Sequence, residues 1–362
     1  MEFKKLSFLA LTACISITGA NYTHAYTLDQ AIANTLKTNP NISANKAKRY
    51  AADNKLRGSY AGYFPTVDAT GFLGRENRNN SLTRNSSGGS KNLTKQDANI
   101  TLSQMLFDGF ATKHDVAEQN YRVAAAAEKV LASVQDVSLQ AIETYIEVLR
   151  RQGLVALAKK NLTAHQKILQ QIRKRTESGV GISSDLEQAR SRMALARTNL
   201  MSEQANLRDA EASYTRIIGI VPADLVRPLA PKKVLPNTVD VALALAVENH
   251  PSLQLAKVEA QAAAAQHKNT KAVFLPKLNF ELSGSHAKGA GGDTQKNNSF
   301  SAGISLKYNI FKGGADVARE QEASWDYETS KEVSRQVRRE VEQNLKLAWN
   351  AFSTARAQLK YF

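Results

Sequence analysis

Cysteine is almost absent from this sequence of 362 residues, and the only one is Cys14. It lies in an N-terminal segment, residues 1–25, in which a basic start and an apolar stretch precede small residues ending at Ala25, as in secretory signal peptides. Cleavage there leaves a chain without cysteine, which excludes disulfides. Alternatively, the residues around Cys14 form a lipoprotein cleavage box, and Cys14 becomes a lipidated N-terminus. Both interpretations predict an exported protein.

Patterns typical of a membrane-spanning helix, a metal site or an enzyme are also lacking. No apolar run beyond the signal segment approaches the ~20 residues that such a helix needs. No histidine outside that segment has a second His or a Cys at ligand spacing, and the glycine-rich stretch 289–292 lacks the Gly-Lys-Ser/Thr ending of a phosphate-binding loop. No Ser/His/Asp set can be assembled. We therefore predict no catalytic residues, no metal, no cofactor and no enzymatic activity.

The formal net charge is +15, a value found in proteins that bind nucleic acids or acidic surfaces. Here, however, the lysines and arginines are interleaved with Glu and Asp along the chain instead of forming a patch. Charges distributed in this way are usually the solvated faces of helices. We therefore expect no nucleic-acid partner.

Proline is absent between Ala111 and Glu177, and the only glycine in this stretch is Gly153. Apolar residues recur there every three or four positions, which predicts a helix with a near-heptad apolar stripe. At 1.5 Å per residue one continuous helix would be roughly 100 Å long, so another element must run beside it. The stripe consists of Val123, Ala127, Val130, Val134, Val137, Ala141, Tyr145 and Val148.

A second heptad pattern follows a break at Gly179-Val180-Gly181-Ile182. We expect the residues from Ser183 to Asp185 to cap this second helix. The helix should return antiparallel to the first, because the turn between them is short. Its apolar positions, interrupted only by Glu203, are Leu186, Ala189, Met193, Ala196, Leu200, Leu207, Ala210, Tyr214 and Ile217.

Four stretches alternate polar and apolar residues, the pattern of β-strands with two different faces. They cover residues 66–75, 97–107, 278–285 and 300–310, and polar loops at 76–95 and 286–298 separate the members of each pair. Such strands are typical of transmembrane β-barrels, although each strand alone fits an edge hairpin of a soluble sandwich equally well. About eight strands are needed to close a barrel, so any barrel must be shared between two, three or four chains.

The two halves of the chain repeat the same features in the same order. Asn39-Pro40 corresponds to His250-Pro251 and Phe64-Pro65 to Leu275-Pro276 at one constant offset, and a matching strand-to-helix junction follows each strand pair. Such a repeat decides the architecture. We therefore divide the chain into a signal peptide (1–25), a first repeat (26–218), a proline-rich linker (219–237) and a second repeat (238–362).

These residues resemble the TolC family of bacterial outer-membrane efflux and secretion channels. The resemblance spans residues 27–362 and rests on the proline motifs of both halves and on three further segments. These are Leu106-Phe107-Asp108-Gly109, Ile310-Phe311-Lys312-Gly313-Gly314 and the turn from Gly179 to Ala189. It implies an α+β membrane protein whose long antiparallel helices form a coiled-coil α-barrel. Each chain would add four transmembrane strands to a 12-stranded β-barrel shared by a homotrimer.

The resemblance also implies a location and partners. The channel would lie in the outer membrane of a Gram-negative bacterium, surrounded by outer-membrane lipid, and span into the periplasm. There it would dock with a periplasmic adaptor (a membrane fusion protein) and an inner-membrane ABC or proton-driven exporter. The cargo would be drugs, other small molecules or, in type I secretion, unfolded proteins. Because the second half lacks the returning helix of the first, we expect a chain that is incomplete at its C-terminus.

Two groups of residues are candidate sites. The turn between the long helices would dock the adaptor through Gly179, Val180, Gly181, Ser183 and Asp185. For the basic residues before it, from Arg173 to Arg175, we favour an interaction with the negative end of the helix dipole over a role in docking. The second group would form an aromatic girdle at the membrane interface, or would simply pack at the corner between barrel and helices. It comprises Tyr63, Phe64, Phe107, Phe110, Tyr308 and Phe311.

The alternative function is that of a soluble periplasmic coiled-coil adaptor or scaffold protein. Such a protein would account for the long helices and the export signal. It would not account for two matched strand pairs with polar loops between their members. The sequence therefore favours the channel.

Overall fold

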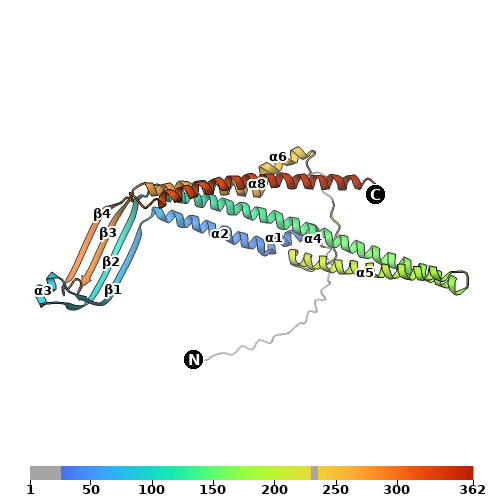
Figure 1. The fold of residues 1–362 in the computed structure, drawn as a ribbon, viewed down its shortest axis with the longest axis horizontal. Helices are drawn as coiled ribbons and strands as arrows, with labels where there is room; N and C mark the ends of the chain where they lie inside the picture. Colours follow the sequence, from blue (N-terminus) through green and yellow to red (C-terminus); the bar gives the residue numbers. More distant parts are fainter. Residues whose placement is uncertain (1–25, 230–234, 362) are drawn as a thin grey trace, which may run out of the picture. The chain divides into compact units, whose positions relative to one another are not determined.

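The computed structural model describes residues 26–229 and 235–361 (Figure 1). The predicted signal peptide with Cys14 lies outside these residues, as does part of the proline-rich linker. The chain forms two compact units: one combines the residues up to Thr38 with Ser138–Ala230, and the other combines Asn39–Val137 with Pro231–Phe362. The long helix α4 (Ala111–Glu177) contributes to both units and has the predicted boundaries.

The first unit is built from α1 (Leu28–Thr38), the C-terminal part of α4 and α5 (Ser183–Ile218). Thr27 and Gln30 form a reciprocal cap at the start of α1. The backbone N–H of Thr27 donates to Gln30 Oε1 at 2.9 Å, and that of Gln30 donates to Thr27 Oγ1 at 3.3 Å. Helix α5 ends at Gly219, whose φ of 87° suits glycine at a helix C-terminus.

Two tyrosines lie at the centre of the first unit's core. Tyr145 of α4 and Tyr214 of α5 are fully buried, with ring centroids 6.3 Å apart. Residues of both predicted apolar stripes surround them: Ala141 and Val148 from α4, and Ala210 and Ile217 from α5. The two heptad patterns therefore pack α5 against α4, as predicted.

The hydroxyl of Tyr145 connects this core to two chain segments outside the helices. It lies 2.7 Å from the carbonyl oxygen of Tyr26, before α1, and 2.7 Å from that of Val226, after α5. A parallel bridge between Tyr26 and Leu225 joins the same two segments. In contrast, the buried hydroxyl of Tyr214 has no hydrogen-bond partner among the described residues. Burial raises the pKa of both phenols.

The two tyrosines provide a matched test of this connection. Tyr145→Phe should lower the free energy of unfolding by about 1 kcal/mol, because two partly buried carbonyl oxygens lose their shared donor. Tyr214→Phe removes a hydroxyl without a partner and should change stability little or increase it. Urea unfolding followed by circular dichroism measures both values. Equal losses in the two variants would contradict the assigned role of Tyr145.

In the second unit, helices α2 (Pro40–Tyr60) and α7 (Pro251–Thr270) start in the same way. The side chain of Asn39 accepts a hydrogen bond from the backbone N–H of Asn41 at 2.9 Å, and His250 Nδ1 accepts from that of Ser252 at 3.3 Å. Proline lacks a backbone N–H, but at the first helical position that group would have no partner within the helix, so proline suits the position after each cap. The Asn-Pro and His-Pro motifs therefore end one helix and begin the next.

Helices α6 (Val239–Asn249) and α7 pack against α8 (Ala315–Gln358) in the same unit. The contact between α7 and α8 includes a charged cluster: His267 Nε2 lies 2.8 Å from Glu320 Oε1, and the Lys271 ammonium lies 3.7 Å from the same oxygen. The hydrogen bond from His267 is the main cause that lowers the pKa of Glu320.

Four strands form one antiparallel sheet in the order β1-β2-β3-β4 (Figure 1). They are β1 (Thr66–Arg78), β2 (Lys91–Phe107), β3 (Lys277–Lys288) and β4 (Lys296–Lys307). Short 3-10 helices, η1 (Ala61–Tyr63) and η2 (Lys271–Phe274), lead into β1 and β3. Apart from one short helix between β1 and β2, the order α1-α2-η1-β1-β2-α4 thus recurs as α6-α7-η2-β3-β4-α8, which confirms the internal repeat.

The first hairpin is longer than predicted. Strand β1 continues to Arg78, which lies opposite Lys91 at the start of β2. The predicted polar loop 76–95 is therefore paired strand at both ends, residues 76–78 and 91–95, with a short helix α3 (Ser81–Ser87) between them. Hairpin pairing outweighs the weak strand propensity of the Asn and Lys residues at these ends.

The second hairpin differs from prediction at its two ends. The predicted loop 286–298 is strand at both ends, residues 286–288 and 296–298, since β3 reaches Lys288 opposite Lys296. Strand β4 ends at Lys307, opposite Lys277 at the start of β3. Residues 308–310 keep the alternating pattern without belonging to the strand, because β3 offers them no further partner.

Candidate functional site

The register divides the sheet into two sides of opposite character. Residues directly paired on neighbouring strands lie on the same side, and one such row consists of Val67, Leu102, Leu282 and Ala302. We call this side the apolar face. The neighbouring rows add further large apolar side chains: Ile100, Leu278, Phe280, Phe300, Ile304 and Leu306. Leu73 lies on the same side but further out, in the row of Gln96, Lys288 and Lys296.

The large side chains of the apolar face lie open. The exposed fractions of Ile100, Phe300 and Ile304 are 59%, 74% and 67%. A contiguous apolar patch of this extent indicates a membrane or a partner surface, because monomeric soluble proteins rarely expose one.

The opposite side, the polar face, is lined by hydroxyl and charged groups. Cross-strand pairs of serines hydrogen-bond at 2.7 Å between Ser283 and Ser301 and between Ser285 and Ser299. The hydroxyl of Ser305 donates to Glu281 Oε1 at 2.7 Å. Every acidic residue of the four strands lies on this face; they are Asp68, Glu76, Asp97 and Glu281.

Both edges of the sheet are open within the described residues. Strands β1 and β4 each pair on one side only. Long edge strands with unpaired N–H and C=O groups are templates for pairing with another chain. An open, two-faced sheet of this kind can be completed by further copies of itself.

The junction from β2 to α4 depends on a left-handed turn. Gly109 and Phe110 have φ values of 74° and 68°. Asp108 Oδ2 accepts hydrogen bonds from the backbone N–H of Thr112 at 2.7 Å and from its hydroxyl at 2.6 Å, which caps the helix start. The sequence analysis missed this role of Asp108, although an Asp-Gly pair before a helix is a turn signal.

All six residues of the predicted aromatic group lie at or next to the helix-proximal end of the sheet. Tyr63 and Phe64 precede β1, Phe107 ends β2, and Tyr308 follows β4. Phe107 and Phe110 form an edge-to-face pair with centroids 5.3 Å apart. Phe311 is 83% exposed. Of the six residues, Phe107 is partly buried and the other five are exposed.

Gly179, Val180 and Gly181 of the predicted tip lie in the turn between α4 and α5, which spans residues 178–182, whereas Ser183 and Asp185 lie in the first turn of α5. The backbone N–H groups of Val180 and Gly181 both donate to the carbonyl oxygen of Arg175, at 3.0 and 2.9 Å. Gly179 has a φ of 78°, and a Cβ on Gly181 would lie 2.8 Å from Thr176 Oγ1. Both glycines are therefore required by the turn itself.

The predicted cap of α5 is wrong. The N-cap residue is Ile182, no side chain caps it, and Ser183 is already helical. The tight turn around Arg175 leaves Ile182 as the last extended residue, so Ser183 to Asp185 fall within the first turn. As a result, two apolar side chains are exposed at the tip: Val180 at 75% and Ile182 at 63%.

Glu203, which interrupts the heptad pattern of α5, has a partner on α4. Its Oε2 lies 3.3 Å from Arg151 Nη1, and Arg151 also binds Glu147 at 2.7 Å. Hydrogen bonds from Arg150 and Arg151 lower the pKa of Glu147 to about 2. The sequence analysis did not foresee this pairing, because it depends on the register between α4 and α5.

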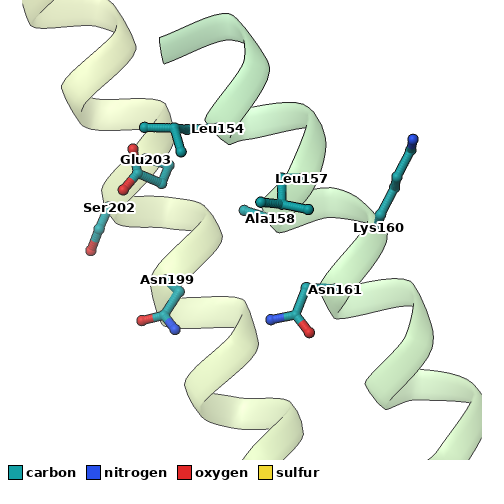
Figure 2. Close-up of a pocket in the computed structure, with 8 residues that line it drawn as sticks. All are labelled: Leu154, Leu157, Ala158, Lys160, Asn161, Asn199, Ser202 and Glu203. Carbon is teal, nitrogen blue, oxygen red and sulfur yellow. The ribbon is translucent and has the colours of Figure 1, made fainter. Parts of the chain in front are cut away.

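A groove of about 660 Å³, lined by both apolar and polar side chains, lies between α4 and α5 next to this cluster (Figure 2). Asn161 of α4 and Asn199 of α5 lie on its two sides, with Leu154 and Leu157 beside them. No group of three or more His, Cys, Asp or Glu residues in the described ranges could hold a metal ion. Separately, none of the helices in the described part of the chain is long and apolar enough to cross a membrane.

Comparison with known proteins identifies the family. The sequence matches the outer membrane efflux protein family over residues 31–220 and 242–362. The chain belongs to the outer membrane efflux protein family. Its two matching regions fall in the two halves of the repeat.

Individual relatives agree with this membership. The chain is 27% identical over 334 residues to the outer membrane efflux protein BepC of Brucella suis, covering 92% of this chain and 71% of BepC. It is 26% identical over 285 residues to the alkaline protease secretion protein AprF of Pseudomonas aeruginosa, covering 73% of this chain and 56% of AprF. The solved outer membrane protein VceC of Vibrio cholerae has the same fold, with a TM-score of 0.75 at 16% identity over 91% of this chain and 79% of VceC.

As an outer membrane efflux protein, the chain is a channel component of the outer membrane and not an enzyme. This confirms the predicted fold class, in which long helices are combined with four antiparallel strands in a repeated arrangement. In outer-membrane β-barrels in general, an apolar outer side meets lipid and a polar inner side meets water.

Proposed function

We propose that three copies of this chain form one 12-stranded β-barrel. The observation that supports it is the sheet itself, whose apolar face is uncovered and whose strands β1 and β4 are open edges. Pairing β1 of one copy with β4 of the next would remove every edge. The serines and carboxylates of the polar face would then line an aqueous lumen.

The helices would extend from this barrel into the periplasm as a channel wall. We propose that the tip docks a periplasmic adaptor, which connects the channel to an inner-membrane ABC or proton-driven exporter. The names of BepC and AprF refer to efflux and to protease secretion, so the cargo class for this chain is drugs and small molecules or unfolded proteins.

Two further assignments belong to this proposal. The exposed aromatic group at the helix-proximal end of the sheet would lie at the interface between the outer membrane and the periplasm. The chain would divide into a signal peptide (1–25), two repeats (26–218 and 238–362) and the linker between them (219–237).

Disulfide cross-linking tests the shared barrel. Thr70→Cys on β1 combined with Ser301→Cys on β4, and neighbouring pairs on the same strands, should give covalent trimers in non-reducing gels of outer-membrane fractions. Ser283→Cys with Ser301→Cys is the control: these residues are directly paired within one chain and should form an intrachain disulfide. A soluble periplasmic pool without intermolecular cross-links would contradict the channel and favour the adaptor alternative.

The tip assignment makes its own prediction. Val180→Asp and Ile182→Asp should reduce cross-linking to the adaptor roughly tenfold, because they place charges on the exposed apolar side chains of the turn without changing its backbone. Bulky residues at Gly179 and Gly181 should have a similar effect through distortion of the turn. Gly153→Leu in α4, where a Cβ meets nothing within 4 Å, is the matched control. Undiminished cross-linking in the tip variants would show that the adaptor docks elsewhere.

A further inference from the structure

Three basic residues lie on the apolar face at its outer end, which is the end of the sheet remote from the long helices. Lys288 of β3 and Lys296 of β4 are directly paired in one row. Arg75 of β1 lies one row further out, opposite Thr94. All three side chains are exposed, and all three are on the same side as the apolar band.

These three residues have no opposite charge to neutralise them. The apolar face contains no acidic residue, and no ion pair joins Arg75, Lys288 or Lys296 to a carboxylate within the described residues. The basic residues at the same end of the polar face differ: Arg78 lies 2.9 Å from Glu76, and Lys95 lies 2.8 Å from Asp97. Like charges placed directly opposite on paired strands are destabilising, so an anion bound from outside the chain would stabilise the Lys288–Lys296 pair.

The distance of these basic residues from the helix-proximal end of the sheet corresponds to the thickness of a membrane. Lys288 lies about ten residues from Leu278 along β3, which is roughly 34 Å at ~3.4 Å per residue. With a strand tilt of ~40° this becomes roughly 26 Å across the bilayer, close to the ~25 Å apolar band of outer-membrane barrels. The basic residues therefore fall at the level of the lipid headgroups on one side of the membrane.

The surroundings of these residues are well fixed. The turn after Lys288 packs closely on β2, since a Cβ on Gly289 would lie 2.3 Å from the Thr94 carbonyl oxygen. The same turn is held to the first hairpin, because Gly291 accepts a hydrogen bond from Asn80 at 2.9 Å and donates one to Glu76 at 3.1 Å. The basic residues thus sit on a rigid scaffold and not on a free loop.

We propose that Arg75, Lys288 and Lys296 bind the headgroup of a glycolipid that carries two phosphates, in the outer leaflet of the membrane. This inference rests on the proposed orientation of the barrel, with its helices in the periplasm. Strands are about 4.8 Å apart and successive rows about 6.8 Å apart, so Arg75 on β1 lies roughly 12 Å from Lys288 on β3 and roughly 16 Å from Lys296 on β4. One phosphate binds between the two lysines and the second binds Arg75. Arginine and lysine are the side chains best suited to phosphate.

The experiment compares lipid binding by the purified full chain and two variants in detergent. The probes are fluorescent bisphosphorylated lipid A and the same lipid without phosphates. The test variant is Arg75→Gln with Lys288→Gln and Lys296→Gln. The control variant is Lys277→Gln with Lys307→Gln, a directly opposed lysine pair at the other end of the sheet and on the polar face. Heat-modifiable gel migration checks that all three proteins are assembled.

The wild type and the control variant should bind the phosphorylated lipid at least tenfold more tightly than the dephosphorylated lipid, since each basic residue near an anionic lipid surface contributes roughly fivefold. The test variant should lose this preference. The proposal is overturned if the wild type shows no preference, if the test variant keeps it, or if millimolar inorganic phosphate displaces the lipid completely, which would indicate a site for soluble anions. A wild type that does not fractionate with the outer membrane would overturn the proposed function instead, whatever its lipid binding.

Discussion

Ile100→Arg should abolish assembly into the outer membrane, whereas Thr101→Arg should leave it largely intact. Ile100 lies on the apolar face, in the row that contains Ala69, Gly284 and Phe300 near the middle of the apolar band. An arginine facing lipid near the bilayer midplane costs about 2–4 kcal/mol in each chain. Three copies in one barrel would bring the penalty to the size of the whole folding free energy of a typical domain.

The neighbouring position is a stringent control. Thr101 is the next residue on the same strand, and it faces the opposite, polar side in the row of Asp68 and Ser283. An arginine there remains in water and gains a carboxylate neighbour. Outer-membrane abundance and heat-modifiable migration measure assembly. If both variants assembled equally, the apolar face would not be the lipid-facing side.

Gly109→Ala should destabilise the junction between β2 and α4 by about 3 kcal/mol. Two penalties combine at this position. A side chain in the left-handed region costs about 1–2 kcal/mol, and here the new Cβ would also lie 2.5 Å from the carbonyl oxygen of Ala272, a clash that only a backbone shift relieves. Because this turn joins the sheet to the longest helix, the loss should appear as a large fall in the temperature at which the assembly unfolds.

The corresponding junction of the second half separates these two penalties. Gly314 precedes α8 with a φ of 81°, but a Cβ there would meet nothing within 4 Å. Gly314→Ala should therefore carry only the conformational cost, about 1–2 kcal/mol. Thermal unfolding of both variants, followed by loss of the folded gel mobility, measures the difference. Equal losses of stability in the two variants would mean that the clash with the Ala272 carbonyl oxygen does not contribute.

Much of the fold could be predicted from the sequence because it depends on local periodicity. The absence of proline and the near-heptad stripe predicted the boundaries of α4 (Ala111–Glu177). The paired proline motifs and alternating stretches predicted the repeat and all four strands. These signals involve residues close to one another in the chain, so one sequence contains them completely. Strand ends were less accurate, because polar residues of the first hairpin are held in the sheet by their partners and not by their own propensity.

The candidate sites were only partly predictable. The turn at Gly179 and the aromatic group stood out by composition. The cap of α5 at Ile182, the hydrogen bonds of Asp108, and the bonds from Tyr145 to Tyr26 and Val226 did not, because each depends on how separate segments meet.

The sequence by itself determined which segments are helix or strand, that they occur twice, and that the strands have two kinds of face. Only the tertiary structure decided how those strands align. A shift of one residue in any register would move that strand's side chains to the other side of the sheet. The observed pairing places every strand carboxylate on the polar face and leaves Arg75, Lys288 and Lys296 together at the outer end of the apolar one. Register is a property of hydrogen bonds between distant segments, and it is therefore the structure that assigns one face to lipid and the other to water.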